Sequence, residues 1–213
     1  MSITIAFEGI DESGKTTQAH ILSRKLAFED ISSVVTCEPT GGMLGDQLSR
    51  GLWGTSNILQ LVLLYAADRC EPAPLEHSTC DLLIKDRSWI SSIAYQANKL
   101  CRWGLTEDPS NPNMEGFVFQ CNQHCMDKDP WFLFDIDPEV AADRQGVALG
   151  VLDIYTLNAV REKYLEVASR PEDHPLYVGP CTVIDADQSV EAVSMCIKER
   201  VIDIMDFIHN GGT

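Results

Sequence analysis

Short apolar runs alternate with longer segments of helical periodicity along the chain. The strand-like runs fall at Ile3–Phe7, Ser33–Thr36, Leu82–Lys85, Trp131–Phe134 and Thr182–Ile184. Parallel strands need a crossover between them, so strands separated by helices are typical of a parallel sheet. The pattern therefore predicts an α/β fold.

One helix is expected to be more apolar than the others. The segment from Ser56 to Arg69 starts at a possible N-cap residue and is apolar on nearly every face, which predicts a buried helix. Tyr65 and Arg69 lie four residues apart near its end, so they should share one face.

A second helix start stands at Asp137, with proline and glutamate in the next two positions. We expect this helix to end at Gly146, with Arg144 in its last turn. The stretch from 145 to 160 lacks lysine and arginine, and the interpretation is a lid or helix connection at about 145–156. Helical spacing continues from Asp153 to Ala168.

Length and charge limit the possible functions. The chain has 213 residues and a formal net charge of −16 at pH 7. This length suits a single domain, 1–213, that buries a substantial core. The negative charge would be repelled by duplex nucleic acid and by anionic membranes, so neither is expected as a partner.

The cysteines indicate a reducing compartment. There are 8 cysteines and no Cys-x-x-Cys pair, which is typical of an intracellular protein with free thiols. The first strand begins too early for a signal peptide, and no apolar run reaches membrane-spanning length. A cytoplasmic location is therefore expected.

Three residues offer an alternative metal chemistry. Cys121, His124 and Cys125 could approach one another on a helix and supply soft ligands, but a fourth ligand is not evident. The sequence leaves open whether they bind a metal.

The strongest chemical signal is a phosphate loop between the first strand and the following helix. The segment GIDESGKT, residues 9–16, has the spacing Gly-x-x-x-x-Gly-Lys-Thr. Such a loop wraps backbone N–H groups around an anion, its lysine reaches the β- and γ-phosphates, and its threonine ligates Mg²⁺. The expected contacts of the triphosphate are Gly9, Glu12, Ser13, Gly14, Lys15, Thr16 and Thr17.

Further polar residues follow the third strand. Asp86 should lie at the carboxyl edge of the sheet, where it could support Mg²⁺ together with Thr16, or simply cap a helix. The segment after Asp86 holds four residues that are spaced to share one helical face suited to a nucleoside: Ser91, Ser92, Tyr95 and Gln96.

Six segments in order, FEGIDESGKTTQ, CEPTGG, LLYAADR, DRSWISSIAYQ, DIDPEVAADR and VIDAD, resemble the motifs of the thymidylate kinase family. Several motifs in the same order are more specific than a phosphate loop alone. The resemblance implies a phosphate-loop nucleoside monophosphate kinase with a three-layer sheet covered by helices on both faces. It also implies ATP, Mg²⁺ and dTMP as small-molecule partners, a closing lid and a homodimer.

The resemblance also implies roles for individual residues. Arg87 would bind the acceptor monophosphate, Asp11 would lie near the acceptor sugar and phosphate, and Asp185 to Asp187 would border adenine. Tyr65 would stack on the base and Arg69 would donate to its O4 atom, although a core tyrosine and a surface arginine remain alternatives. The expected acceptor contacts are Glu38, Pro39, Tyr65, Arg69, Arg87, Ser91, Ser92, Tyr95 and Gln96.

The chain departs from the family where a transition-state arginine is expected. Glu12 occupies the phosphate-loop position of that arginine, and the predicted lid has no lysine or arginine. Arg144, in the helix before the lid, is the candidate replacement, so the expected catalytic residues are Lys15, Arg87, Asp11 and Arg144. Cys37 replaces an arginine that is common before the Glu-Pro turn.

These features predict transfer of the γ-phosphoryl group of Mg·ATP to dTMP. Two alternatives remain open from the sequence: a related deoxynucleoside monophosphate kinase with a changed base preference, and a weakly active homologue that binds nucleotide and regulates a partner.

Overall fold

The architecture was examined in a computed structural model, which describes residues 2–51, 57–71, 80–97, 112–126, 128–145 and 151–211. Five parallel strands form one sheet in the order β2-β3-β1-β4-β5. These strands span Ile3–Gly9 (β1), Ser33–Cys37 (β2), Leu82–Asp86 (β3), Trp131–Asp135 (β4) and Cys181–Asp185 (β5). All five predicted strands are confirmed, each one to two residues longer than the apolar run that indicated it.

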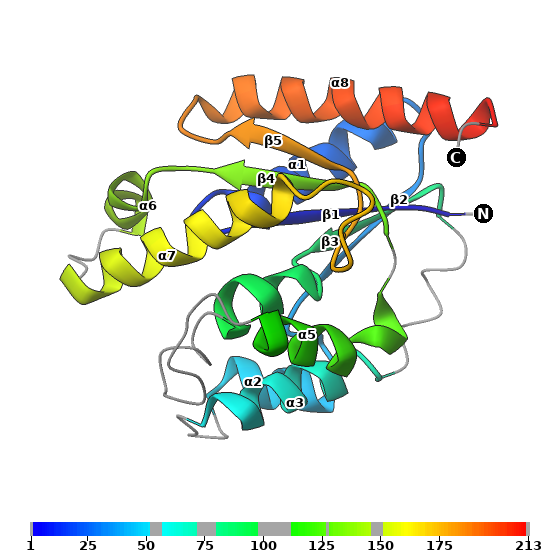
Figure 1. Ribbon diagram of the computed structural model, residues 1–213. Coiled ribbons are helices and arrows are strands. Elements are labelled where there is room, and N and C mark those ends of the chain that lie inside the picture. Colours follow the sequence, from blue (N-terminus) through cyan, green and yellow to red (C-terminus); the bar gives the residue numbers. More distant parts are fainter. Residues whose placement is uncertain are drawn as a thin grey trace.

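Helices cover both faces of this sheet, as Figure 1 shows. One face is covered by α1 (Lys15–Ala27) and α8 (Val190–His209). The other face carries α3 (Ile58–Asp68), α5 (Pro112–Cys121) and α7 (Val151–Ala168), with α2 (Met43–Ser49) packed against α3. The predicted three-layer α/β fold is therefore confirmed.

The central strand β1 explains why this sequence folds so. Every residue of β1 except Thr4 is buried, as expected for a strand that has helices on both sides. Phe7 packs edge to face on Phe132, with ring centroids 5.6 Å apart, and at a tilt on Phe134, with ring centroids 5.0 Å apart. The aromatic core lies directly beneath the phosphate loop and gives the loop a rigid base.

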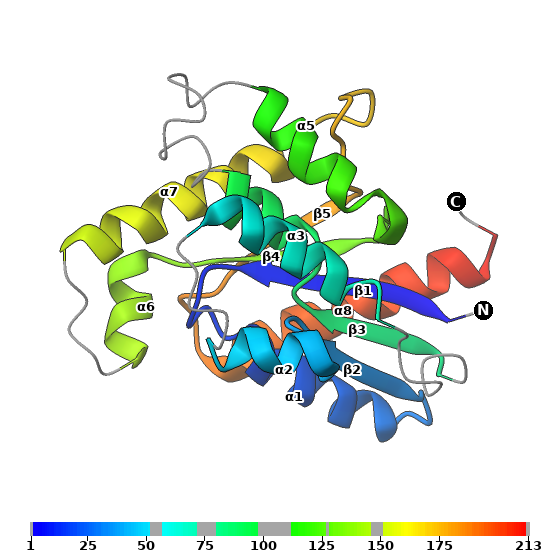
Figure 2. The same cartoon turned by 90° about the horizontal axis from the view of Figure 1, so that it is seen from below.

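The sheet brings the chemically important segments to one edge. The carboxyl ends of β1 and β3 lie side by side, with Phe7 opposite Asp86. The short helix α6 (Pro138–Gln145) follows the carboxyl end of β4 and so lies at this same edge of the sheet, as seen in Figure 2. Asp137 caps α6, since its Oδ1 accepts the Glu139 N–H at 2.8 Å. The predicted start of this helix is thus confirmed.

The prediction for α3 was wrong in two respects. The helix begins after Asn57, whose side-chain oxygen accepts the N–H groups of Leu59 and Gln60. Only one face is buried, and Leu63 is 55% exposed. The apolar run is longer than one buried face needs, so part of it points to solvent beside α2.

The segment after α6 is only partly within the described residues. The predicted helix end at Gly146 lies outside them, and so does most of the predicted lid. α7 begins at Val151 rather than at Asp153, so the last part of the range 145–156 is already helical. Of the helices in the described ranges, none combines the length and the apolar character needed to cross a membrane.

Candidate functional site

The phosphate loop joins β1 to α1 and depends on two glycines. Gly9 has φ 146°, and a Cβ atom there would lie 2.7 Å from the Phe134 carbonyl oxygen. Gly14 has φ 93° and stands at the N-cap position of α1. No side chain caps the first N–H groups of α1, which leaves these donors and the positive end of the helix dipole for an anion.

Lys15 lies buried within this loop. Its Nζ donates to the Ile10 carbonyl oxygen at 2.7 Å and to the Ser13 hydroxyl at 3.1 Å. Burial, helped by the positive charge of Arg87, lowers the pKa of Lys15 to about 7. A phosphate group would supply the negative charge that this ammonium needs to stay protonated.

Thr16 and Asp86 form a pair that fits a divalent cation. The Thr16 hydroxyl donates to the Asp86 carboxylate, which lies at the carboxyl end of β3. Hydroxyl and carboxylate oxygens are the hard ligands that Mg²⁺ prefers, and this pairing is that of phosphate-loop enzymes. The two predicted metal residues are therefore adjacent, as their assigned role requires.

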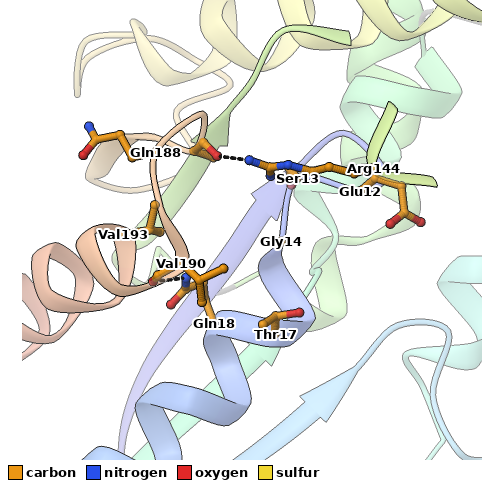
Figure 3. Close-up of a pocket in the computed structure, with 10 residues that line it drawn as sticks. Glu12, Ser13, Gly14, Thr17, Gln18, Arg144, Gln188, Val190 and Val193 are labelled. Atoms are coloured by element: carbon orange, nitrogen blue, oxygen red, sulfur yellow. Dashed lines mark hydrogen bonds between the residues drawn. The ribbon is translucent and has the colours of Figure 1, made fainter. Parts of the chain in front are cut away.

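A cavity of about 340 Å³ opens beside the phosphate loop. Figure 3 shows that the loop and α1 form one wall, while α6 and the start of α8 form others. Arg144 enters this cavity from α6, and its Nη2 donates to the Ala186 carbonyl oxygen at 2.8 Å. The lining residues are Glu12, Ser13, Gly14, Thr17, Gln18, Arg144, Ala186, Gln188, Val190 and Val193.

The shape and polarity of this cavity suit a nucleotide. The N-terminus of α1 at Gly14 would face the phosphates, and Val190 and Val193 add an apolar surface, with Val190 lying beside Gln18 of α1. The peptide groups around Ala186 belong to the loop predicted to border adenine. Four of the seven predicted phosphate contacts line this cavity together with Arg144, whereas Gly9, Lys15 and Thr16 do not line it. Contact between Arg144 and a nucleotide stays a prediction.

Arg87 stands on the other side of the phosphate loop. Its backbone has φ 74°, and its guanidinium donates to Asp11 and, at 3.2 Å, to the Ser91 hydroxyl. The guanidinium also lies over the Tyr95 ring, 5.3 Å from the centroid. Tyr95 in turn accepts the Asp11 N–H at 3.1 Å. Three predicted residues, Asp11, Ser91 and Tyr95, therefore surround the Arg87 guanidinium next to the phosphate loop.

Arg69 is more constrained than its sequence context suggests. Its side chain is 5% exposed, which excludes the alternative of a surface arginine. Nε donates to Glu38, Nη1 donates to Ser92 at 2.9 Å and to Asn122 at 2.7 Å, and Nη2 donates to Glu38 and to the Ser88 carbonyl oxygen. All five guanidinium N–H groups are engaged, so a base oxygen would have to share or displace one of these bonds.

Of the remaining acceptor candidates, Tyr65 contacts Arg69. The Arg69 guanidinium lies 5.9 Å from the centroid of the Tyr65 ring, so these two residues do share one face. The Pro39 carbonyl accepts the Cys37 thiol at 3.7 Å. Gln96 is buried, and its Oε1 has no partner among the described residues. Tyr65, Pro39 and Gln96 remain predicted contacts, since none of them is fixed by a bond to the others.

The serine and tyrosine face predicted after Arg87 differs from a regular α-helix. Ser92–Ala97 forms a π-helix, η2, which is frequent at functional sites. Ser92 is buried and faces Arg69, whereas Ser91 faces Arg87 and the Glu8 carboxylate. The predicted residues therefore divide between two hydrogen-bonded clusters and do not form one continuous face.

The possible metal site of Cys121, His124 and Cys125 is not formed. α5 ends at Cys121, and residues Gln123–Cys125 form a separate 3-10 turn, η3, that redirects the chain. His124 Nε2 instead lies 3.0 Å from the Cys70 thiol. Within the described ranges no cluster of three or more such ligands could hold a metal ion.

Sequence reasoning missed several residues of this site. Glu8, Ser88, Asn122 and Tyr164 are all buried, and each one hydrogen-bonds to a predicted site residue or to another member of this group. Glu8 could have been found, because a carboxylate in a strand expected to be buried on both faces requires partners. Asn122 and Tyr164 gave no local signal, since their partners are distant in the sequence.

The fold and this edge of the sheet define a phosphate-loop nucleotide-binding protein with a second cationic site next to the loop. Residues 7–197 match the family model for thymidylate kinase, so the chain belongs to the thymidylate kinase family. A probable thymidylate kinase from Methanococcus aeolicus is 35% identical over 95% of this chain and 97% of its own length.

Other relatives agree with this assignment. A thymidylate kinase from Symbiobacterium thermophilum is 31% identical over 96% of this chain and 95% of its own. A probable thymidylate kinase from Methanocaldococcus jannaschii is 34% identical over 77% of this chain and 80% of its own. The resemblance inferred from the six motifs is thereby confirmed.

Proposed function

We propose that the protein transfers the γ-phosphoryl group of ATP to dTMP, giving dTDP and ADP. The observation that supports this most directly is that two cations, Lys15 within the phosphate loop and Arg87 beside it, lie close enough to interact electrostatically. Lys15 would hold the donor phosphates, and Arg87 would hold the acceptor phosphate through a guanidinium fork. The transferring group would then lie between two fixed cations.

The residues would act chiefly by positioning and by charge. Phosphoryl transfer requires the attacking and leaving oxygens in line and stabilisation of the charge that spreads over the equatorial oxygens. Thr16 and Asp86 would hold Mg²⁺, which neutralises the β- and γ-phosphate charges when it is bound. Asp11 orients the Arg87 guanidinium before the acceptor arrives, and Tyr95 provides an aromatic surface beside it.

Base choice is proposed to reside in the Arg69 cluster. Arg69 offers only N–H donors, and its position is fixed by Glu38 and Asn122. A donor cluster favours the 4-keto group of thymine over the 4-amino group of cytosine. Comparing turnover with dTMP and with dCMP therefore tests the alternative of a changed base preference.

The first test is ADP release from Mg·ATP with dTMP, dUMP, dCMP, dGMP, dAMP and UMP as separate acceptors. We expect turnover with dTMP that exceeds turnover with dCMP by at least about 10²-fold, because the 4-amino group of cytosine would place a donor against the Arg69 donors. Omission of Mg²⁺ in the presence of a chelator should abolish the reaction. Nucleotide binding without turnover on any acceptor would instead support the regulatory alternative.

We also propose that the protein acts as a homodimer in the cytoplasm. Leu63 on α3 and Met43 on the adjoining α2 are large apolar side chains that are 55% and 72% exposed, and such a surface favours association. Light scattering coupled to size exclusion should give about twice the 23.6 kDa mass of one chain. A monomeric mass at micromolar concentration would refute this assignment.

A further inference from the structure

Glu8 is a buried carboxylate one residue before the phosphate loop begins. The residue is 0% exposed. Its Oε1 accepts the backbone N–H and the hydroxyl of Ser88, both at 2.7 Å. Its Oε2 accepts the hydroxyls of Ser91 at 2.6 Å and Tyr164 at 2.8 Å. Four donors thus converge on one carboxylate that none of the proposed substrates could reach.

These four bonds connect three separate parts of the site. Glu8 belongs to β1, directly before the phosphate loop, Ser88 and Ser91 follow Arg87 in the chain, and Tyr164 belongs to α7. Burial of a carboxylate is unfavourable unless it is well paired. Burial raises the pKa of Glu8, against the opposing hydrogen bond from Ser91 and the charge of Arg87. Such an arrangement indicates a role beyond filling space.

The role concerns the backbone of Arg87. A non-glycine residue at φ 74° is strained and persists only where its surroundings fix it. The Arg87 N–H donates to the Phe7 carbonyl oxygen at 3.0 Å, and the next N–H, that of Ser88, donates to Glu8. Strand β1 therefore holds two consecutive peptide groups of the turn, one through its backbone and one through Glu8.

We propose that Glu8 is a positioning residue that fixes the Arg87 turn against the phosphate loop and so sets the distance between acceptor and donor phosphates. This inference rests on the proposed phosphoryl transfer to dTMP. Glu8 touches neither substrate and acts through Arg87. The hydrogen bond from Tyr164 to Glu8 connects α7 to the same cluster. The Tyr164 ring also packs edge to face on the Tyr95 ring, with centroids 6.2 Å apart.

The test variant is Glu8→Gln, which keeps the shape but has a single acceptor oxygen. In either orientation of the amide, two of the four donors lose their acceptor. We expect kcat/KM for dTMP to fall by about 10²-fold, through a lower kcat and a higher KM for dTMP, because small misplacements of reacting groups have effects of this size. KM for ATP should change less than about twofold, since Lys15 and Thr16 are not bonded to Glu8.

A matched control separates positioning from stability. Val201 is fully buried on α8, away from the Arg87 turn, and Val201→Ala should lower the melting temperature without changing either KM. A loss of folded protein lowers apparent kcat alone, whereas displacement of Arg87 also raises KM for dTMP. If Glu8→Gln does not fold, Ser88→Ala replaces it, because this variant removes one donor to Oε1 and leaves the carboxylate; a smaller change in the same two constants is expected.

The decisive comparison is a double-mutant cycle with Arg87→Ala. If Glu8 acts through Arg87, the double variant should have the same kcat/KM for dTMP as Arg87→Ala alone. Fully multiplicative effects, or a Glu8→Gln variant with both KM values and kcat unchanged, would overturn the proposal. Wild-type protein is assayed first: absence of dTMP turnover there would refute the proposed function, whereas wild-type turnover with unaltered variants would refute only the role of Glu8.

Discussion

Replacing Lys15 by methionine is expected to lower kcat/KM by about 10³-fold while making the ligand-free protein more stable. The activity is lost because Lys15 supplies a fixed positive charge next to the transferring phosphoryl group, and removal of one such preorganised group typically costs 10² to 10³ in rate, or about 3 to 4 kcal/mol. The measurement is steady-state turnover with dTMP at saturating Mg·ATP, beside chemical unfolding of the same samples.

The gain in stability follows from the lowered pKa of Lys15. The folded-state pKa is about 7, against 10.5 for an exposed lysine. The unfolded chain therefore binds more protons between pH 7 and 10.5, so this residue makes stability rise with pH across that window and is most unfavourable below it. Methionine removes a cost of a few kcal/mol but leaves the Ile10 carbonyl and Ser13 without their donor, so a net gain of about 1 to 2 kcal/mol at pH 7 is expected.

The same pKa predicts proton uptake when ATP binds. Near pH 7 about half of the free protein has a neutral Lys15, and the phosphates of ATP raise the pKa of Lys15 and restore the charge. Above pH 7 ATP affinity should fall by up to tenfold per pH unit until the pKa of the complex is reached. Calorimetry in buffers of different ionisation enthalpy should detect this proton, and the Lys15→Met variant should not take it up. A pH-independent ATP affinity between pH 6 and 9 would contradict the prediction.

The sequence predicted those parts of the molecule that depend on local patterns. Strand β1 and the loop at Gly9 and Gly14 follow from an apolar run and a fixed motif, and the cap at Asp137 follows from three adjacent residues. Each of these features is determined within about ten residues of chain. Their structures could therefore be inferred without knowledge of the tertiary fold.

The missed features arise from contacts between distant segments. The five N–H groups of Arg69 are taken up by Glu38, Ser88, Ser92 and Asn122, which lie 19 to 53 positions away. The run in α3 predicted burial on nearly every face, but packing against α2, η2 and α5 selects the face that is buried, and Leu63 stays exposed. Hydrophobic periodicity states how much of a helix is apolar and does not state which neighbours cover it.

Glu12 stands at the phosphate-loop position where the family resemblance led us to expect a transition-state arginine, and Arg144→Ala is expected to show whether Arg144 replaces that arginine. Arg144 lines the same cavity as Glu12, Ser13 and Gly14. Its Nη2 donates a hydrogen bond to the Ala186 carbonyl oxygen. A single, partly buried bond to a backbone carbonyl can be exchanged for a stronger charge-assisted bond to phosphate. We therefore expect Arg144 to turn toward the phosphates when ATP and dTMP are both bound.

If Arg144 stabilises the transferring group, Arg144→Ala should lower kcat by about 10³-fold with little change in KM for ATP, since a transition-state arginine contributes about 10³ to 10⁵ in rate. If Arg144 only flanks adenine, KM for ATP should rise and kcat should persist, because that contact is the same in the ground state and the transition state. Arg144→Lys keeps the charge without the planar fork and should recover only part of the rate. Arg24→Ala removes an exposed arginine from the far end of α1 and serves as the control for net charge. If kcat is unchanged in Arg144→Ala, a residue other than Arg144 must stabilise the transferring phosphoryl group.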